Sequence, residues 1–359
     1  MKKVIFLFAM VFALSFAMAQ NNTADVNQVG NGNNGIVNQS GNSNSANVDQ
    51  YGSNIAKVEQ VGISNKGKIA QGASGASVLN NYVPGYPGDW KEGAFINQSG
   101  ERNDAEIDVN VSRNGSRIDQ LGNDNWAKQE VNSAFARTTN WDRMGVDINQ
   151  EGNNNWANQK TIASFGTYGV QGMKINQDGN YNVADQLSIG GMSNATEIEQ
   201  IGNNNNNPDQ SGNTFNVSAT GLANPLALSW AHKPVGNYTQ YMFQNKGATH
   251  MYVEGNNNNT AQYQEYSVWS VSGQNDAWMD IFGSENNVAQ GQLGDMNSSE
   301  IDIAGDDNVV TSSQFGDNNF VEIDLTGASN VVGVQQVGDF HSAAVLQTGN
   351  SNFAQVIQQ

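Results

Sequence analysis

The sequence predicts an all-β protein, a β-solenoid in which short strand-and-turn units stack along one axis. Glycines recur every eleven residues in the last third of the chain, and apolar and polar residues alternate between them. A fixed period with one residue type in fixed phase indicates stacked copies of a unit that cannot bury its apolar face alone. The turn glycines in this phase are Gly283, Gly294, Gly305, Gly316, Gly327, Gly338 and Gly349, with Gly30, Gly41 and Gly52 near the start of the chain.

The first segment of the chain predicts export. Lys2 and Lys3 precede an apolar run that ends in an Ala-x-Ala motif at Ala17–Ala19. A basic start, a short apolar core and a small-residue end are typical of a secretory signal peptide. The run is too short for a transmembrane helix, and no later stretch is apolar for long enough to be one. We therefore expect residues 1–19 to be removed and residues 20–359 to form the solenoid.

Composition narrows the possible functions. The formal net charge is -18, so nucleic acid and anionic lipid are not expected partners. The chain has no cysteine, so stability has to come from packing and hydrogen bonds although export would permit disulfides. A composition rich in Asn, Gln, Gly and Ser alone is typical of disorder. The strict period argues against disorder, because a disordered linker has no reason to keep register.

Each unit of eleven residues consists of one predicted strand and one predicted turn. With position zero set two residues before the glycine, Gln39 is zero, Gly41 is +2, Asn44 is +5, Ala46 is +7 and Val48 is +9. Positions +7 and +9 are apolar and alternate with polar residues, which is the period of a strand with one buried face. Positions +2 to +5 are rich in Gly, Asn, Asp and Ser, as a tight turn requires.

Two units make one coil. Position zero alternates between amide and aliphatic residues, as in Gln292, Ile303 and Gln314, so the full repeat has about 22 residues and the chain has about a dozen coils. Coils stacked at ~4.8 Å place like residues above like, and stacked Asn and Gln amides then form hydrogen-bonded ladders. At position zero the expected ladder residues are Gln28, Gln39, Gln50, Gln98, Gln120, Gln292, Gln314, Gln336, Gln347 and Gln358. At position +5 they are Asn44, Asn103, Asn114, Asn125, Asn286, Asn297, Asn308, Asn319, Asn330 and Asn352, and His341 interrupts this series.

Five inserts break the period. They lie near 73–94, 132–146, 161–174, 219–237 and 265–277, and they hold four of the five prolines and many large aromatic residues. Proline is excluded from the interior of a sheet, so these segments are predicted loops. The frame predicts that the first four follow an odd-numbered strand and leave from one edge, with the fifth out of phase unless an insert hides an extra strand. Such an edge is either a set of tolerated surface loops or a surface that binds a partner or a matrix glycan.

The frame Gln-x-Gly-x-x-Asn-x-Ala-x-x-x-Gln resembles the curlin repeat of bacterial curli fibres. The segment from Gln39 to Gln50 matches it closely, and the segment from Gln28 matches with Gly35 in place of alanine. The resemblance implies a cross-β subunit of an extracellular functional amyloid of a Gram-negative bacterium, with a curli-type export pore and a nucleator as partners. The resemblance covers nearly the whole chain apart from the inserts. Because this chain is longer than a typical curlin and carries inserts, a major subunit and a minor or nucleator-like variant both remain open.

The expected function is the fibre itself, a biofilm scaffold and surface adhesin. A solenoid has two open ends with unpaired strand edges, and the last strand, near Phe353–Gln358, carries no charge that would block it. The alternative is a capped monomeric β-solenoid adhesin. No enzyme activity and no cofactor are expected, because the three histidines are far apart and no catalytic motif occurs.

An acidic rim is the one candidate for cation binding. Glu300 and Glu322 are 22 residues apart, as are Asp302 and Asp324, so the frame stacks them as like charges one coil apart. The rim is either a solubilising face or a brake on assembly that acid or divalent cations relieve.

Overall fold

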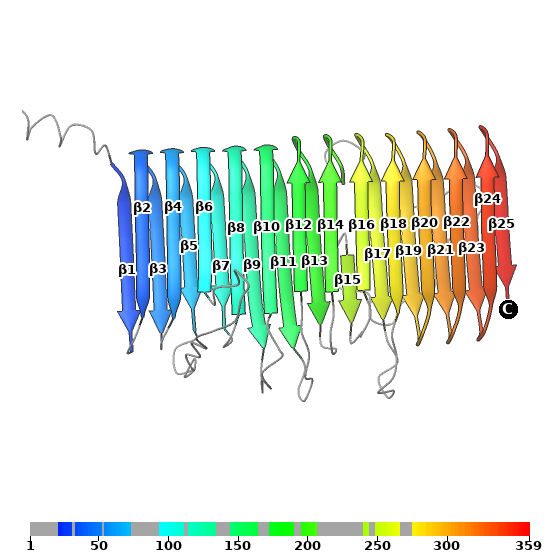
Figure 1. Ribbon diagram of the computed structural model, residues 1–359, viewed down its shortest axis with the longest axis horizontal. Helices are drawn as coiled ribbons and strands as arrows, with labels where there is room; N and C mark the ends of the chain where they lie inside the picture. Colours follow the sequence, from blue (N-terminus) through cyan, green and yellow to red (C-terminus); the bar gives the residue numbers. More distant parts are fainter. Residues whose placement is uncertain are drawn as a thin grey trace, which may run out of the picture.

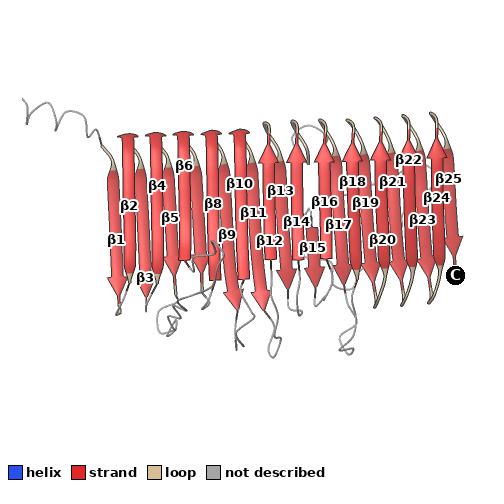
Figure 2. Ribbon diagram, in the orientation of Figure 1, coloured by secondary structure: helices blue, strands red, loops and turns tan. Residues whose placement is uncertain are grey.

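The computed structural model describes residues 21–30, 33–51, 54–72, 93–110, 114–133, 144–163, 172–189, 195–206, 240–243, 248–265 and 275–359. Over these residues the chain is the predicted all-β solenoid, with 25 strands in two long sheets (Figures 1 and 2). The odd-numbered strands form a 13-stranded sheet in chain order, here called the odd sheet, and the even-numbered strands form a 12-stranded even sheet. The chain crosses to the other sheet at every turn, so one odd and one even strand make one coil.

The strands are short and similar in length. The odd sheet holds β1 (Thr23–Val29), β3 (Ser45–Tyr51), β5 (Lys66–Gln71), β7 (Asp104–Val109), β9 (Trp126–Ser133), β11 (Trp156–Ala163), β13 (Val183–Ile189), β15 (Gln240–Phe243), β17 (Asn259–Glu265), β19 (Asn287–Leu293), β21 (Val309–Phe315), β23 (Val331–Val337) and β25 (Phe353–Gln358). The even sheet holds β2 (Asn34–Asn42), β4 (Ile55–Ile63), β6 (Gly93–Glu101), β8 (Asn114–Asn123), β10 (Met144–Asn153), β12 (Gly172–Asp178), β14 (Ala195–Ile201), β16 (Ala248–Glu254), β18 (Asp276–Phe282), β20 (Ser298–Ala304), β22 (Phe320–Thr326) and β24 (Ser342–Thr348).

Parallel, in-register pairing produces columns, meaning sets of residues at the same place in successive coils. In the β2–β4 pair, Val37 lies opposite Val58 and Gln39 lies opposite Gln60, and the other pairs follow the same rule. The middle inward column of the even sheet is aliphatic throughout and is almost completely buried between its ends. Its members are Val37, Val58, Ile96, Ile118, Ile148, Ile175, Ile198, Met251, Met279, Ile301, Ile323 and Val345.

The turns explain the glycine period. Gly41 has a φ of 109°, and a Cβ on it would lie 1.9 Å from the carbonyl oxygen of Gly62 in the next coil. A side chain is therefore excluded both by the backbone angle and by the neighbouring coil. Ser43, two residues later, is also left-handed, with a φ of 59°. The predicted turn glycines all have positive φ except Gly52, which lies outside the described residues.

The inserts fall mostly outside the described residues, and the strands beside them extend at most three residues into the expected bounds. The strands that the inserts follow differ from the prediction. The first three and the fifth follow odd strands, β5, β9, β11 and β17, whereas the fourth, in 207–239, follows the even strand β14. The predictions that the fourth follows an odd strand and that the fifth is out of phase were therefore both wrong. Three strands, β12, β13 and β14, separate the third insert from the fourth, and an odd number of strands shifts the next insert to the other sheet.

No helix in the described part of the chain is long and apolar enough to cross a membrane. The expected signal peptide, residues 1–19, lies outside that part.

Candidate functional site: amide columns and the two end faces

An unbroken asparagine column runs along the turns that precede the odd strands. Asn65 donates its backbone N–H to Asn44 Oδ1 at 3.0 Å, and Asn103 donates its own to Asn65 Oδ1 at 3.0 Å. The Asn65 Nδ2 donates to the carbonyl of Gly100 at 2.9 Å, so the side chain satisfies backbone groups of the turns. The column consists of Asn22, Asn44, Asn65, Asn103, Asn125, Asn155, Asn182, Asn205, Asn258, Asn286, Asn308, Asn330 and Asn352.

A second asparagine column occupies the opposite turns, those that precede the even strands. It consists of Asn33 and Asn54 at one end, and of Asn275, Asn297, Asn319 and then His341 at the other. The predicted asparagines thus divide between two columns. By register Asn114 stands at the position of this second column in β8, where β10 places Met144 beside it instead of an asparagine.

Glutamines form two ladders at the predicted zero position. In each link, Nε2 donates to Oε1 of the next coil toward the C-terminus, for example from Gln98 to Gln120 at 2.8 Å. The second proton of Gln98 Nε2 goes to the carbonyl of Lys66 on the facing strand at 2.8 Å, which satisfies a fully buried amide. The even sheet carries Gln39, Gln60, Gln98, Gln120, Gln150, Gln177 and Gln200. The odd sheet carries Gln28, Gln50 and Gln71, and later Gln264, Gln292, Gln314, Gln336 and Gln358.

The sequence prediction missed a further glutamine ladder in the middle of the odd sheet. Gln129 donates to Gln159 at 3.1 Å, and Gln159 donates to Gln186 at 2.9 Å. Gln129 and Gln159 lie two positions before the expected zero position, which Val131 and Thr161 occupy. The available signal was a glutamine two positions before a zero position that is not an amide, as in Gln129 before Val131 and Gln159 before Thr161. The inserts hid it by spacing the glutamines irregularly.

The two terminal coils carry matching inward residues. Reading inward positions in order, β1 has Ala24, Val26 and Gln28 while β25 has Ala354, Val356 and Gln358, and β2 has Gly35, Val37 and Gln39 while β24 has Ala343, Val345 and Gln347. We call β1 with β2 the N-terminal end face and β24 with β25 the C-terminal end face; they lie at opposite ends of the rod (Figure 1). Val26 is 42% exposed, while Val48 above it in the same column is 0% exposed. Core side chains therefore stand open at this end face.

The end faces also hold incomplete hydrogen bonds. Gln358 Oε1 accepts from Gln336 at 2.7 Å, but among described residues Gln358 Nε2 donates only to Ser342 O at 3.0 Å. Gln347 Oε1 is buried without a partner, because the residue before it in the column is Leu325, which cannot donate. The Gln336–Gln358 ladder is thus open toward a further coil, whereas the unpartnered oxygen of Gln347 is the atom that would accept from the preceding coil.

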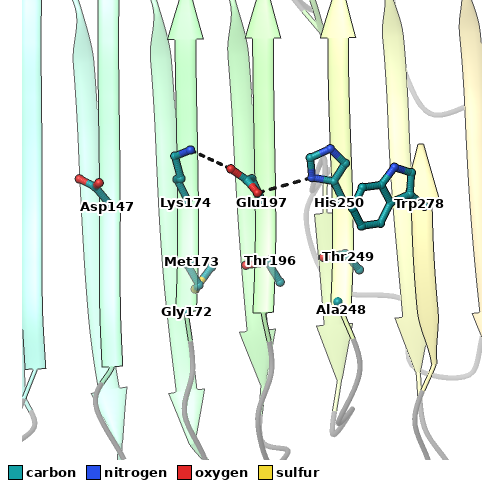
Figure 3. A pocket seen from close by; sticks show the side chains of 10 residues that line it. All are labelled: Asp147, Gly172, Met173, Lys174, Thr196, Glu197, Ala248, Thr249, His250 and Trp278. Carbon is teal, nitrogen blue, oxygen red and sulfur yellow. Dashed lines mark hydrogen bonds and ion pairs between the residues drawn. The ribbon is translucent and has the colours of Figure 1, made fainter. Parts of the chain in front are cut away.

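A charged row crosses the outer face of the even sheet on β10, β12, β14, β16 and β18 (Figure 3). Lys174 Nζ lies 2.8 Å from Glu197 Oε1, and His250 Nδ1 lies 3.5 Å from Glu197 Oε2. His250 stacks on Trp278 with ring centroids 4.2 Å apart. The row lines a pocket of about 310 Å³ together with Asp147, whose pKa is raised by burial. Asp147, Lys174, Glu197 and His250 follow one another along the rod, and Lys174 pairs with Glu197.

Beyond Trp278 the outer face becomes uniformly acidic. Glu300 lies opposite Glu322, and Asp302 lies between Asp280 and Asp324. Burial and the surrounding carboxylates raise the pKa of Asp302 to about 6. Among described residues no group of three or more His, Asp or Glu side chains is arranged to hold a metal ion. The rim therefore consists of two columns of like charge, one of glutamates and one of aspartates.

Buried amide columns and matching end faces define a class of protein, a β-solenoid built from stacked amyloid-like repeats. The chain carries curlin associated repeats, because two segments, residues 19–52 and 327–359, match the sequence model of that repeat. No curated protein matches the chain. The two matched segments contain β1 to β3 and β23 to β25, so they include both end faces.

Proposed function

We propose that the protein is a structural subunit of an extracellular curli-like amyloid fibre that grows end to end. In this assembly β1 of one copy stacks on β25 of another, and β2 stacks on β24. The observation that carries the proposal is the match between the end faces, where alanine or glycine, valine and glutamine occupy the same inward positions in the same order. Each column then passes from one copy to the next without a change of chemistry.

The junction would continue both glutamine columns into the next copy. Following the direction of every other link, Gln358 Nε2 would donate to Gln28 Oε1 of the next copy, and Gln347 Nε2 would donate to Gln39 Oε1. Val356 would cover the exposed Val26. Open apolar and amide columns of matching register favour addition of another identical coil.

Charge supports the same assembly. The last coil, Ser342–Gln358, has no charged residue, and Asp25 is the one charged residue on β1 and β2. Like charges stacked on neighbouring strands destabilise a sheet. End faces that carry a single charged residue between them therefore allow contact between copies of a chain whose net charge is -18.

We further propose, from the predicted signal peptide and the family, that the chain is secreted through a curli-type pore and serves biofilm matrix and surface adhesion. A capped monomeric adhesin and a nucleator-like minor subunit are the competing possibilities. The fibre itself would be the function, with no catalytic residue.

The test is assembly of the mature chain, residues 20–359, diluted from denaturant. We expect thioflavin-positive unbranched fibres, a ~4.8 Å meridional reflection and seeding by fibre fragments. The variant Val26→Lys, which places a charge on the N-terminal end face, should fold but not elongate seeds. A soluble β-rich monomer that never seeds would overturn the proposal and favour the capped adhesin.

A further inference from the structure

His341 ends the asparagine column that precedes the even strands. Asn319 Oδ1 accepts the backbone N–H of His341 at 2.9 Å, as Asn297 Oδ1 accepts that of Asn319 at 3.0 Å. In the end-to-end assembly proposed above, the next member of this column is Asn33 of a second copy, because β2 stacks on β24. The backbone N–H of that Asn33 meets the side chain of His341 instead of an asparagine amide.

The imidazole of His341 takes the place of an asparagine side chain. Its Nε2 lies 3.2 Å from Val337 O, four residues earlier, and Asn352 Nδ2 makes the same contact to Thr348 O at 3.4 Å. A carbonyl oxygen only accepts, so Nε2 carries the proton. Nδ1 of the neutral ring is then an acceptor, and it is bonded to Cγ as Oδ1 is in asparagine.

The turn glycine beside it gives a second measure of this similarity. A Cβ added to Gly338 would lie 2.8 Å from His341 Nε2, whereas one added to Gly349 would lie 3.5 Å from Asn352 Nδ2. The donor nitrogen of His341 therefore lies on the same side of its turn as the donor of asparagine.

We propose that His341 makes addition of a subunit to the C-terminal end face sensitive to pH; this inference rests on the proposed end-to-end assembly. In the neutral ring, Nδ1 accepts the backbone N–H of the incoming Asn33 and the column continues. In the imidazolium, Nδ1 carries a proton and faces that N–H as a second donor, so the bond is lost. Histidine is the side chain whose charge ordinarily changes between pH 5 and 8.

The charged groups around His341 are few. Asp339 lies in the same turn, and its Oδ1 accepts the backbone N–H of Asp317 in the preceding turn at 2.8 Å. The strands β22 and β24 present Phe320 and Ser342 beside it, and the incoming turn, residues 30–33, reads Gly-Asn-Gly-Asn. The incoming copy therefore brings no carboxylate to this turn that would compensate an imidazolium.

The experiment compares elongation of preformed seeds by the mature chain at pH 7.5 and 5.5. Lowering the pH from 7.5 to 5.5 should slow elongation by wild type about fivefold more than it slows elongation by His341→Asn. This is the factor that loss of one ordinary hydrogen bond gives. His341→Asn restores the asparagine column, so it should fold and elongate at both pH values. His250→Asn, on the outer face of β16, should retain the wild-type response and serves as the matched control. Circular dichroism of each monomer checks folding.

The outcomes separate the two proposals. If neither wild type nor His341→Asn elongates at any pH, the end-to-end fibre is wrong, and the role of His341 falls with it. If both elongate with the same pH profile, the fibre stands and the role of His341 is overturned. A pH response that disappears in His250→Asn instead would assign the effect to the row on the even sheet.

Discussion

Leu325 and Gln347 occupy successive places in one inward column of the even sheet, and Gln347 Oε1 is buried there without a hydrogen-bond donor. The column is aliphatic before Leu325, with Ile303 and Ile281 preceding it. Within one chain a further leucine would continue the column better than a glutamine. The glutamine fits only a neighbour that also presents an amide, and in the proposed fibre that neighbour is Gln39 of the next copy.

Gln347→Leu should therefore stabilise the monomer and impair the fibre. Removing a buried unpaired oxygen is expected to raise the free energy of unfolding by about 1 kcal/mol. The new leucine would leave Gln39 of the incoming copy unpaired, and seeded elongation should slow about tenfold. Urea unfolding and seeded thioflavin kinetics measure the two effects. Faster elongation by Gln347→Leu would contradict the junction.

An internal link should behave differently from a terminal one. Gln98 is fully buried, accepts from Gln60 and donates to Gln120 and to Lys66 O. Gln98→Leu leaves several of these groups unpaired and should lower the free energy of unfolding by about 3 kcal/mol. Asn97→Ala, at an exposed neighbouring position in the same strand, is the matched control and should change stability by less than about 0.5 kcal/mol. Equal effects would show that the ladder does not stabilise the fold.

The glycine turns make a sharper prediction. A Cβ on Gly316, whose φ is 117°, would lie 2.2 Å from the carbonyl of Gly338. Gly316→Ala should therefore destabilise the last coils by several kcal/mol, about 3 or more, through strain and displacement of the next turn. Gly172→Ala has nothing within 4 Å of the new Cβ and should be nearly neutral. Thermal unfolding followed by circular dichroism distinguishes them, and equal melting temperatures would refute the steric argument.

The repeating part of the fold could be predicted because its cause is local and periodic. Gly283 to Gly349 fix the turns, and the alternation after each glycine fixes which side chains point inward. The registers of Gln292 with Gln314 and of Asn286 with Asn308 follow from the period alone. The sequence therefore predicted the coil and the terminal ladders.

The middle of the rod was less predictable, because inserts reset the count. Gln129 and Gln159 pair across 30 residues, a distance that no eleven-residue frame yields. Asn114 keeps the predicted phase but lies opposite Met144, whose position in the sequence is set by an insert. Position in the repeat is a local property, while the neighbour in the next coil depends on every residue between them.

The acidic rim should make stability fall as pH rises. Burial, and after it the stacked carboxylates, raise the pKa of Asp302 to about 6, above the ~3.9 of an unfolded chain. The folded state then holds the proton more tightly, so stability decreases from about pH 4 to pH 6 and the penalty is complete above it. Asp302→Asn should flatten this dependence. It should raise the free energy of unfolding at pH 7.5 by about 1 kcal/mol or less, because solvent screens the repulsion between these partly exposed carboxylates. Asp307→Asn, which removes a carboxylate from a turn, is the control; an equal gain there would attribute the effect to net charge.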